Sequence, residues 1–175
     1  MMSYGTFNQT LPLGERVSRH FHGLSISDID TEVRTGGGNA CGTDALTGND
    51  VPVVTLSGAS YTIPAGTPFQ LDGTANDGSG TTLEYAWDQM DLFGDSTAAA
   101  PLFRSSGLLA SGYKTFPSLL RDYVDETLPT GSETYTFRLT ARDNVPGGGG
   151  VGAADVQVTT DDSVGPFVVT FASTP

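Results

Sequence analysis

The sequence contains little cysteine, little positive charge and no long apolar run. Cys41 is the only cysteine among 175 residues, so no disulfide can form within the chain. No stretch approaches the roughly 20 apolar residues that a membrane-spanning helix needs, so membrane insertion is not expected. The first ten residues, MMSYGTFNQT, have neither the basic start nor the apolar centre of a signal peptide.

Basic residues are scarce: eight Lys and Arg stand against 20 Asp and Glu, for a net charge of −12. Nucleic acids and anionic lipid surfaces attract positively charged proteins, so this balance speaks against both as partners. The acidic excess fits divalent cations, and it equally fits an acidic surface that binds nothing. Charged residues make up only 16% of the chain, and Gly, Ser and Thr fill the space, which is typical of short strands joined by turns.

The common signatures of enzyme chemistry are missing as well. The chain has no H-E-x-x-H zinc motif and no G-x-S-x-G nucleophile elbow. The four glycines from Gly147 to Gly150 lack the lysine and the following helix of a phosphate-binding P-loop, so we interpret them as a hairpin connection. Cys41 has no obvious base nearby, and we expect a buried or inert thiol. The chain itself is therefore not expected to be an enzyme.

One helix is expected near the start of the chain. The segment LSISDIDTEVR places Ile26, Ile29 and Val33 at helical spacing, and three glycines follow it. Ser25 is the expected N-cap, with Asp28 three residues later as a weak capping box.

From Asn49 onward the patterns predict strands. In TYTFRLTARD, apolar and polar residues alternate, so Tyr135, Phe137 and Leu139 should face a core. Further strands are expected at VPVVTLS, TPFQLDG, TLEYAWDQ, AADVQVTT and PFVVTFAS, and residues 89–131 are expected to form a long irregular insert. Several short strands separated by turn signals predict an immunoglobulin-like sandwich.

Three motifs occur in an order that is found in a known family. FQLDGTANDGSG is an acidic Gly-rich turn, LEYAWD contains Y-x-W-D, and YTFRLTARDN contains Y-x-x-x-L-x-x-x-D-N. Together they resemble polycystic-kidney-disease-type (PKD) and related cadherin-like domains, over residues 49 to about 160. The residues that match the two strand motifs are Tyr85, Trp87, Asp88, Tyr135, Leu139, Asp143 and Asn144. The insert at 89–131 departs from the short pattern of that family.

A second resemblance covers nearly the whole chain. MMSY resembles a Met-turn, HFHGLSISDI the final strand and helix of a catalytic domain, and ACGT…TGNDVPVV the junction after it. The segments from PLFRS to GGGGVGAADVQV resemble the module that follows in secreted bacterial metzincin-type (reprolysin-like) zinc peptidases. In that family the three zinc histidines would precede residue 1, so the resemblance implies no zinc in this chain.

His20 and His22 are the only histidines. On a strand they would face the same side and could bind a metal, with Asp28 or Asp30 as further ligands. A structural role on a strand that leads into the helix is the expected alternative.

Three pairs of Asn and Asp residues are better candidates for a metal site. They are Asn49, Asp50, Asn76, Asp77, Asp143 and Asn144. Calcium takes six to eight oxygen ligands, and these pairs could gather at one pole of a sandwich. Calcium-binding PKD-type domains use comparable positions. The alternative is that the six residues only close turns by bonding their own backbone.

The C-terminal segment VGPFVVTFAS is apolar on both faces, so its own domain or another chain must cover it. If it is donated to a neighbouring subunit, a fibre or oligomer results.

We therefore expect a mainly β protein: an immunoglobulin-like (PKD/cadherin-like) β-sandwich over residues 49–175. Residues 1–48 are expected to be a short strand-helix appendage that resembles the C-terminal end of a metzincin catalytic domain. The expected function is a non-catalytic structural or binding module, extracellular or at the cell surface, whose partner is itself or an upstream peptidase domain. The alternative is a C-terminal fragment of a secreted zinc metallopeptidase whose sandwich aids substrate engagement. For an extracellular protein, the missing signal peptide suggests a fragment or a processed form.

Overall fold

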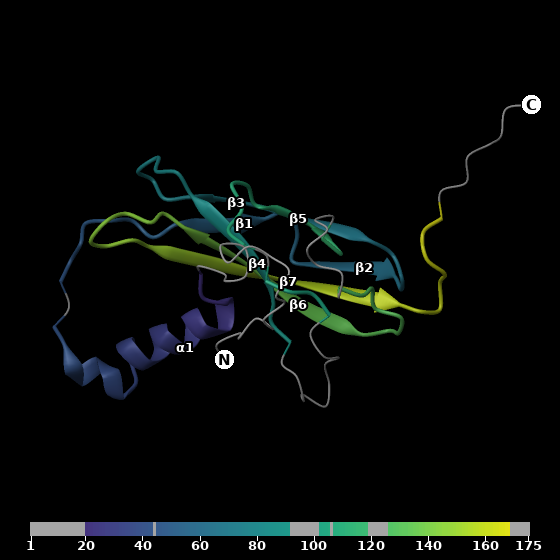
Figure 1. Ribbon diagram of the computed structural model, residues 1–175, viewed down its shortest axis with the longest axis horizontal. Helices are drawn as coiled ribbons and strands as arrows, with labels where there is room; N and C mark the ends of the chain where they lie inside the picture. Colours follow the sequence, from purple (N-terminus) through teal and green to yellow (C-terminus); the bar gives the residue numbers. More distant parts are fainter. Residues whose placement is uncertain (1–19, 44, 92–101, 106, 119–125, 169–175) are drawn as a thin grey trace, which may run out of the picture.

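The computed structural model describes residues 20–43, 45–91, 102–105, 107–118 and 126–168, and these are mainly β (Figure 1). The elements in chain order are α1 (Gly23–Arg34), the 3-10 helix η2 (Gly37–Cys41), β1 (Val53–Leu56), β2 (Ser60–Pro64), β3 (Phe69–Asn76), β4 (Glu84–Gln89), β5 (Tyr113–Phe116), β6 (Thr134–Arg142) and β7 (Val151–Asp161). Neither helix in these ranges is long and apolar enough to cross a membrane. The expected Met-turn, MMSY, lies outside the described residues.

The strands form two sheets, which together make a β-sandwich-like fold. One sheet has the order β1-β3-β5 and the other the order β2-β7-β6-β4. Neighbouring strands are antiparallel, except that β2 runs parallel to β7. Helix α1 lies beside the four-stranded sheet, on the side away from β1 and β3 (Figure 1).

The core lies between the two sheets and confirms the alternation that was predicted for β6. Tyr135, Phe137 and Leu139 are at most 2% exposed, and Val156 and Val158 of β7 pack with them. Burying these side chains removes apolar surface from water, at roughly 25 cal/mol per Å². Four phenylalanine rings fill one half of this core, with ring centroids 4.9 to 5.8 Å apart: Phe69, Phe103, Phe116 and Phe137.

Strand β4 is buried on both faces, although its alternation predicted one face turned away from the core. Trp87 faces the core, and its indole N–H donates to the carbonyl of Gly112 at 3.0 Å. Ala86 and Asp88, on the opposite face, are completely buried as well. Something other than the partner sheet must therefore cover the outer face of β4.

The sequence analysis missed two strands, β2 and β5, and its prediction of a last strand at PFVVTFAS was wrong in part. Strand β2 was not predicted, although Tyr61 and Ile63 alternate with polar residues in this short strand. Strand β5 lies inside the expected irregular insert, where the buried Lys114 interrupts the apolar pattern. The last expected strand, PFVVTFAS, is not a strand over residues 166–168, and its remaining residues lie outside the described ranges.

Helix α1 confirms the predicted helix but begins earlier than expected. Its N-cap is His22, whose Nδ1 accepts the Leu24 N–H at 3.1 Å, and Ser25 lies inside the first turn. The predicted Ser25 cap is therefore wrong. The expected strand before the helix is also absent over residues 20–22, where the backbone bends into the N-cap.

The Gly-rich segment forms the predicted hairpin connection. Strand β6 pairs with β7 along its whole length, from Thr134↔Thr159 to Arg142↔Val151. The connection needs left-handed backbone at Asn144 (φ 52°) and Gly147 (φ 83°), which Asn tolerates and Gly adopts freely. The glycines therefore serve the turn rather than a phosphate.

Candidate functional site

The segments that contain the three Asn/Asp pairs do come together at one end of the sandwich. The Asn49 side-chain amide donates to Asp143 Oδ2 at 2.6 Å, across 94 residues of sequence. Asp77 lies close enough for its negative charge to act on Asp143. Asp50 lies beside the Asn76–Gly78 turn, since a Cβ added at Gly78 would meet Asp50 Oδ2 at 3.3 Å. We call this end, defined by residues 49–50, 76–81 and 143–150, the acidic pole.

Asp143 closes the β6–β7 connection from within. Its Oδ1 accepts the backbone N–H groups of Val145 at 3.1 Å and Gly150 at 2.8 Å, and its Oδ2 accepts Asn49. Burial alone would raise the pKa of Asp143, but these three donors outweigh it and lower the pKa below the usual value. The carboxylate is therefore held ionised by the loops that it joins.

Asp77 does the same for the turn after β3. The Thr81 hydroxyl donates to Oδ2, and the N–H groups of Ser79 and Gly80 donate to Oδ1 at 3.0 and 2.9 Å. The Thr81 hydrogen bond is the largest cause that lowers the pKa of Asp77, to about 2. Asn76 Oδ1 accepts the Gly78 N–H at 2.8 Å, so both residues of this pair cap their own turn.

In this geometry Asn76, Asp77 and Asp143 accept backbone N–H groups of their own turns, and Asn49 donates to Asp143. Within the described ranges, no group of three or more His, Cys, Asp or Glu side chains is arranged to hold a metal ion. Asn144 points to another partner, because its amide donates to Glu84 Oε2. Asp50 is the exposed carboxylate of the pole. Calcium binding at this pole stays a prediction.

A shallow depression of about 510 Å³ lies next to the pole, along β1. Its lining includes Val51 and Val53, which are 54% and 68% exposed, together with Asp50 and Asp77. Strand β1 is one edge of its three-stranded sheet. Val53 and its cross-strand partner Asn76 both line the depression, so it lies over the β1–β3 pair, with polar and apolar side chains in its lining.

A second polar centre, which the sequence did not indicate, holds α1 against the four-stranded sheet. Asp88 of β4 is completely buried, and its Oδ2 accepts the Gly23 N–H at 2.9 Å. Its Oδ1 accepts the Ser105 hydroxyl and lies 3.8 Å from His22 Nε2. A carboxylate at the N-terminus of a helix also interacts favourably with the helix dipole. We call this arrangement the helix anchor.

Two arginines of β6 complete the helix anchor. Arg138 forms a two-pronged ion pair with Asp155, at 2.6 and 2.7 Å, and donates from Nη1 to the Ser27 hydroxyl at 2.7 Å. Arg142 Nη2 donates to the carbonyl of Phe21 at 3.0 Å. Through these contacts, α1 and the residues just before it cover the outer face of β4 and β6. Asp88 and Arg138 are direct cross-strand partners. Their opposite charges, at outward positions of two predicted strands, were the sequence signal that could have indicated this centre.

His20 and His22 do not lie on a strand, and within the described residues they form no group with Asp28 or Asp30 that is arranged to hold a metal ion. His22 is the N-cap of α1, and Asp28 and Asp30 are exposed on the helix, with Asp30 paired to Arg34. Burial lowers the pKa of His20, which favours its neutral form. Both histidines lie at the helix anchor, but not on the strand that the structural alternative expected. Cys41, expected to be buried or inert, is exposed at the end of η2.

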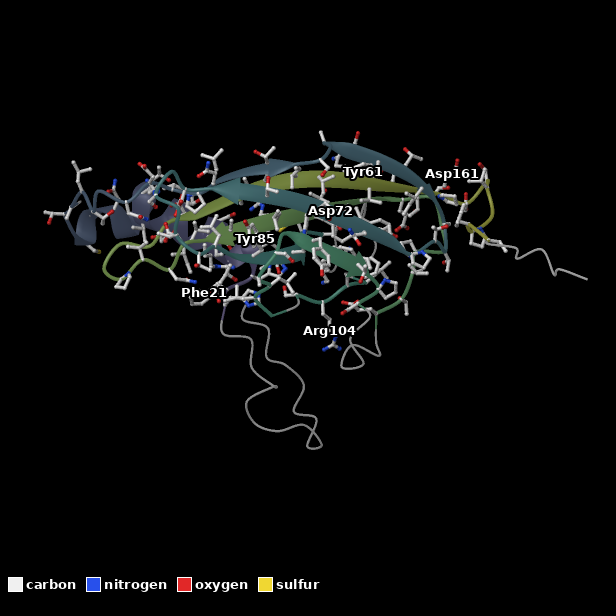
Figure 2. The ribbon with its side chains drawn as sticks, turned by 90° about the horizontal axis from the view of Figure 1, so that it is seen from above. Phe21, Tyr61, Asp72, Tyr85, Arg104 and Asp161 are labelled. Carbon is white, nitrogen blue, oxygen red and sulfur yellow. The ribbon has the colours of Figure 1, made fainter. Side chains whose placement is uncertain are left out.

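The chain beyond β7 leaves both sheets. Asp161 ends β7, and the segment that follows it turns at that end of the sandwich (Figure 2), where a Cβ added at Gly66 would meet Pro166 Cβ at 3.6 Å. We call residues 162–168 the C-terminal tail. Its apolar residues Val164, Phe167 and Val168 are 47%, 73% and 70% exposed, and the Phe167 N–H donates to Thr67 Oγ1 at 3.0 Å.

Comparison with known proteins adds no family. The chain matches no protein-family model and no curated protein.

Proposed function

We propose that this chain is a non-catalytic structural or binding module of the cell surface or extracellular space, and that it assembles through its terminal segments. The single observation that carries the proposal is the placement of exposed apolar side chains on segments outside the sheets. Phe167 and Val168 in the C-terminal tail, and Ile29 and Val33 on α1, are all between 48% and 73% exposed. Contiguous exposed apolar groups mark surfaces that other proteins cover, and here the four side chains form two pairs of neighbours, one on α1 and one in the tail.

The two segments lie toward opposite ends of the molecule. Figure 1 shows α1 extending toward one end of the long axis and the C-terminal tail leaving at the other. Contacts made at both ends join modules in a row, either as copies of this chain or as neighbouring bodies in a longer chain. A module of this shape spaces or links its neighbours.

The helix anchor supports a mechanical role for the first of these ends. Asp88 and Arg138 fix the first turn of α1, whereas its last two turns are exposed. A body that packs on Ile29 and Val33 would be held in a fixed orientation to the sandwich. Under the alternative proposal, that body is the rest of an upstream zinc peptidase domain, and the sandwich helps to engage its substrate.

The immunoglobulin-like (PKD/cadherin-like) identity of the sandwich is part of the proposal. The order of the strands in the two sheets and the Trp87 side chain in the core support it. Calcium at the acidic pole belongs to the same proposal, because Asn49, Asp77 and Asp143 come from three segments that meet there.

Deletion of Pro166 to Pro175 tests the assembly. Light scattering of the intact chain should show a mass above that of the monomer, and the deleted chain should be a monomer. An unchanged oligomer after the deletion would remove the C-terminal tail from the proposal. An H-E-x-x-H-x-x-G-x-x-H motif in frame before residue 1 would favour the peptidase alternative.

A further inference from the structure

Both histidines of the chain lie where α1 meets the sandwich. His22 is the N-cap of the helix, and His20 lies two residues before it. Between them, the carbonyl of Phe21 accepts Arg142 Nη2 at 3.0 Å. Histidine is the side chain whose ordinary pKa lies between pH 5 and pH 8. The joint between helix and sandwich therefore contains the side chains that ordinarily change charge near neutral pH.

The N-cap bond of His22 is made by the neutral imidazole. Its Nδ1 accepts the Leu24 N–H at 3.1 Å, and a protonated ring has no acceptor at that atom. A positive charge there would also face the positive end of the helix dipole. The attraction of Asp88 opposes this, but Asp88 Oδ1 is 3.8 Å from Nε2, which is too long for a hydrogen bond. Both oxygens of Asp88 already accept other donors, the Gly23 N–H and the Ser105 hydroxyl.

His20 lies where protonation is disfavoured. Burial is the largest cause that lowers its pKa below the usual 6.5, and the positive charge of Arg142 acts in the same direction. The negative charge of Asp88 acts in the opposite direction without reversing the shift. Arg142 is only 8% exposed, so solvent screens its charge weakly.

The other charges around His20 belong to groups that ordinarily titrate elsewhere. Glu84 is the cross-strand partner of Arg142, and Arg138 is that of Asp88, all four on the outer face of β4 and β6. Carboxylic acids ordinarily titrate near pH 4, and arginine stays charged to above pH 12. The first turn of α1 contributes no acidic residue that could offset a new positive charge.

Helix α1 is held to the sheet by its first turn. Gly23 is its one buried residue, and a Cβ added there would meet Arg138 Cδ at 3.1 Å and Asp88 Oδ2 at 3.3 Å. The helix has 12 residues, and a helix of this length without tertiary contacts is marginal in water. Loss of the first-turn contacts is therefore expected to unfold α1 while the sandwich core remains.

We propose that the helix anchor is a pH-sensitive joint, which holds α1 on the sandwich near neutral pH and releases it when His20 and His22 become protonated. This inference goes beyond the proposed function and does not depend on assembly. At His20 the docked state binds fewer protons than the released state, so docking is strongest above pH 6.5 and weakens as the pH falls below that value. A body packed on Ile29 and Val33 would then lose its fixed orientation in acid.

The test follows amide exchange of the intact chain by NMR from pH 7.5 to pH 5.5, corrected for the intrinsic effect of pH. Protection of α1 amides should fall by up to about tenfold per pH unit below 6.5. Ile26 is a suitable reporter, because its N–H donates to the His22 carbonyl at 3.1 Å. Amides of β6 and β7 should keep their protection, and the His20 ring signals should titrate over the same range as the loss in α1.

Two non-titrating variants test the histidines separately. His20→Gln keeps a hydrogen-bonding side chain, and His22→Asn keeps an N-cap. Each should flatten part of the α1 profile, and the double variant should keep α1 protected at pH 5.5. Asp28→Asn, at an exposed position of the same helix, is the matched control and should follow the intact chain.

Three results would overturn the joint: constant α1 protection in the intact chain, a double variant whose profile runs parallel to that of the intact chain, or loss of protection in β6 and β7 together with α1. If a variant already lacks α1 protection at pH 7.5, the intact chain decides. There, a His20 titration that does not coincide with the loss of α1 protection contradicts the inference. None of these results bears on the proposed assembly.

Discussion

The carboxylate of Asp88 accepts the backbone N–H of Gly23 at 2.9 Å, across 65 residues of sequence and inside the protein. This bond connects the first helix to an outward position of a strand in the sandwich. It explains why a charged residue lies completely buried between Trp87 and Gln89. The same carboxylate receives the Ser105 hydroxyl, so it also holds a segment of the insert.

Asp88→Ala is expected to release α1 and to lower the free energy of unfolding by about 3 kcal/mol, because it leaves buried donors without their acceptor. The amides of the first turn of α1 should exchange faster with solvent. Asp155→Ala is the control: it removes the exposed partner of Arg138 and should cost about 0.5 kcal/mol. Equal effects of the two substitutions, measured by urea unfolding and amide exchange, would contradict the anchor.

Asp77 is expected to make stability depend on pH in the acid range. Its folded pKa of about 2 lies below the usual 3.8, so its contribution is fully present above pH 3.8 and is lost as the pH falls toward 2. Asp77→Asn keeps an oxygen that can accept the Ser79 and Gly80 N–H groups but does not titrate. Its melting temperature should therefore fall less between pH 4 and pH 2 than that of the unchanged chain. Asp28→Asn, on the exposed face of α1, is the control. If the melting temperature of Asp77→Asn falls with pH in parallel with that of the unchanged chain, the role of Asp77 is refuted.

Glu126 is expected to hold the insert to the sandwich. Its two oxygens accept the N–H groups of Arg104 at 3.0 Å and Ser118 at 2.6 Å, and Lys114 Nζ lies 3.9 Å away. Glu126→Ala should cost about 3 kcal/mol of unfolding free energy, because it leaves Lys114 buried without its anion. Lys114→Met should cost less, since Glu126 keeps both backbone donors. The reverse order in denaturant titrations would show that the lysine, and not the glutamate, is the essential partner.

Calcium at the acidic pole predicts a higher melting temperature in millimolar calcium than in the same concentration of sodium chloride. Asp143→Ala should abolish the shift, but it also removes the hydrogen bonds to Val145 and Gly150. Asp50→Asn is therefore the sharper variant, because Asp50 is exposed and its loss leaves those bonds intact. If calcium produces no shift in the unchanged chain, the Asn and Asp residues only close turns.

Local patterns were sufficient to predict the strands whose apolar residues face the core. Strands β6 and β7 follow the predicted alternation, and β4 was placed correctly by its Tyr85 and Trp87. Strand β2 was missed, because it has only five residues, the first three are exposed, and its parallel partner β7 is distant in sequence. The Ser25 cap was predicted wrongly for the same kind of reason: the partner of the helix N-terminus, Asp88, is distant in sequence.

The pole was predicted in part from its chemistry and its turns. Asx residues at strand ends pointed to Asn49, Asp77 and Asp143, and the fold brings their segments together. The sequence pattern could not show that backbone N–H groups donate to these carboxylates, because those hydrogen bonds depend on the local course of each loop. The apolar C-terminal segment was predicted as a strand, and its position outside both sheets over residues 165–168 is what now points to a partner.

The most direct test of the central claim is sedimentation velocity on the intact chain, from micromolar to millimolar concentration. The account predicts a weight-average mass that rises steadily with concentration, and a series in Phe167→Ser/Val168→Ser that stays at the monomer mass. A monomer at every concentration in the intact chain would contradict assembly through the terminal segments.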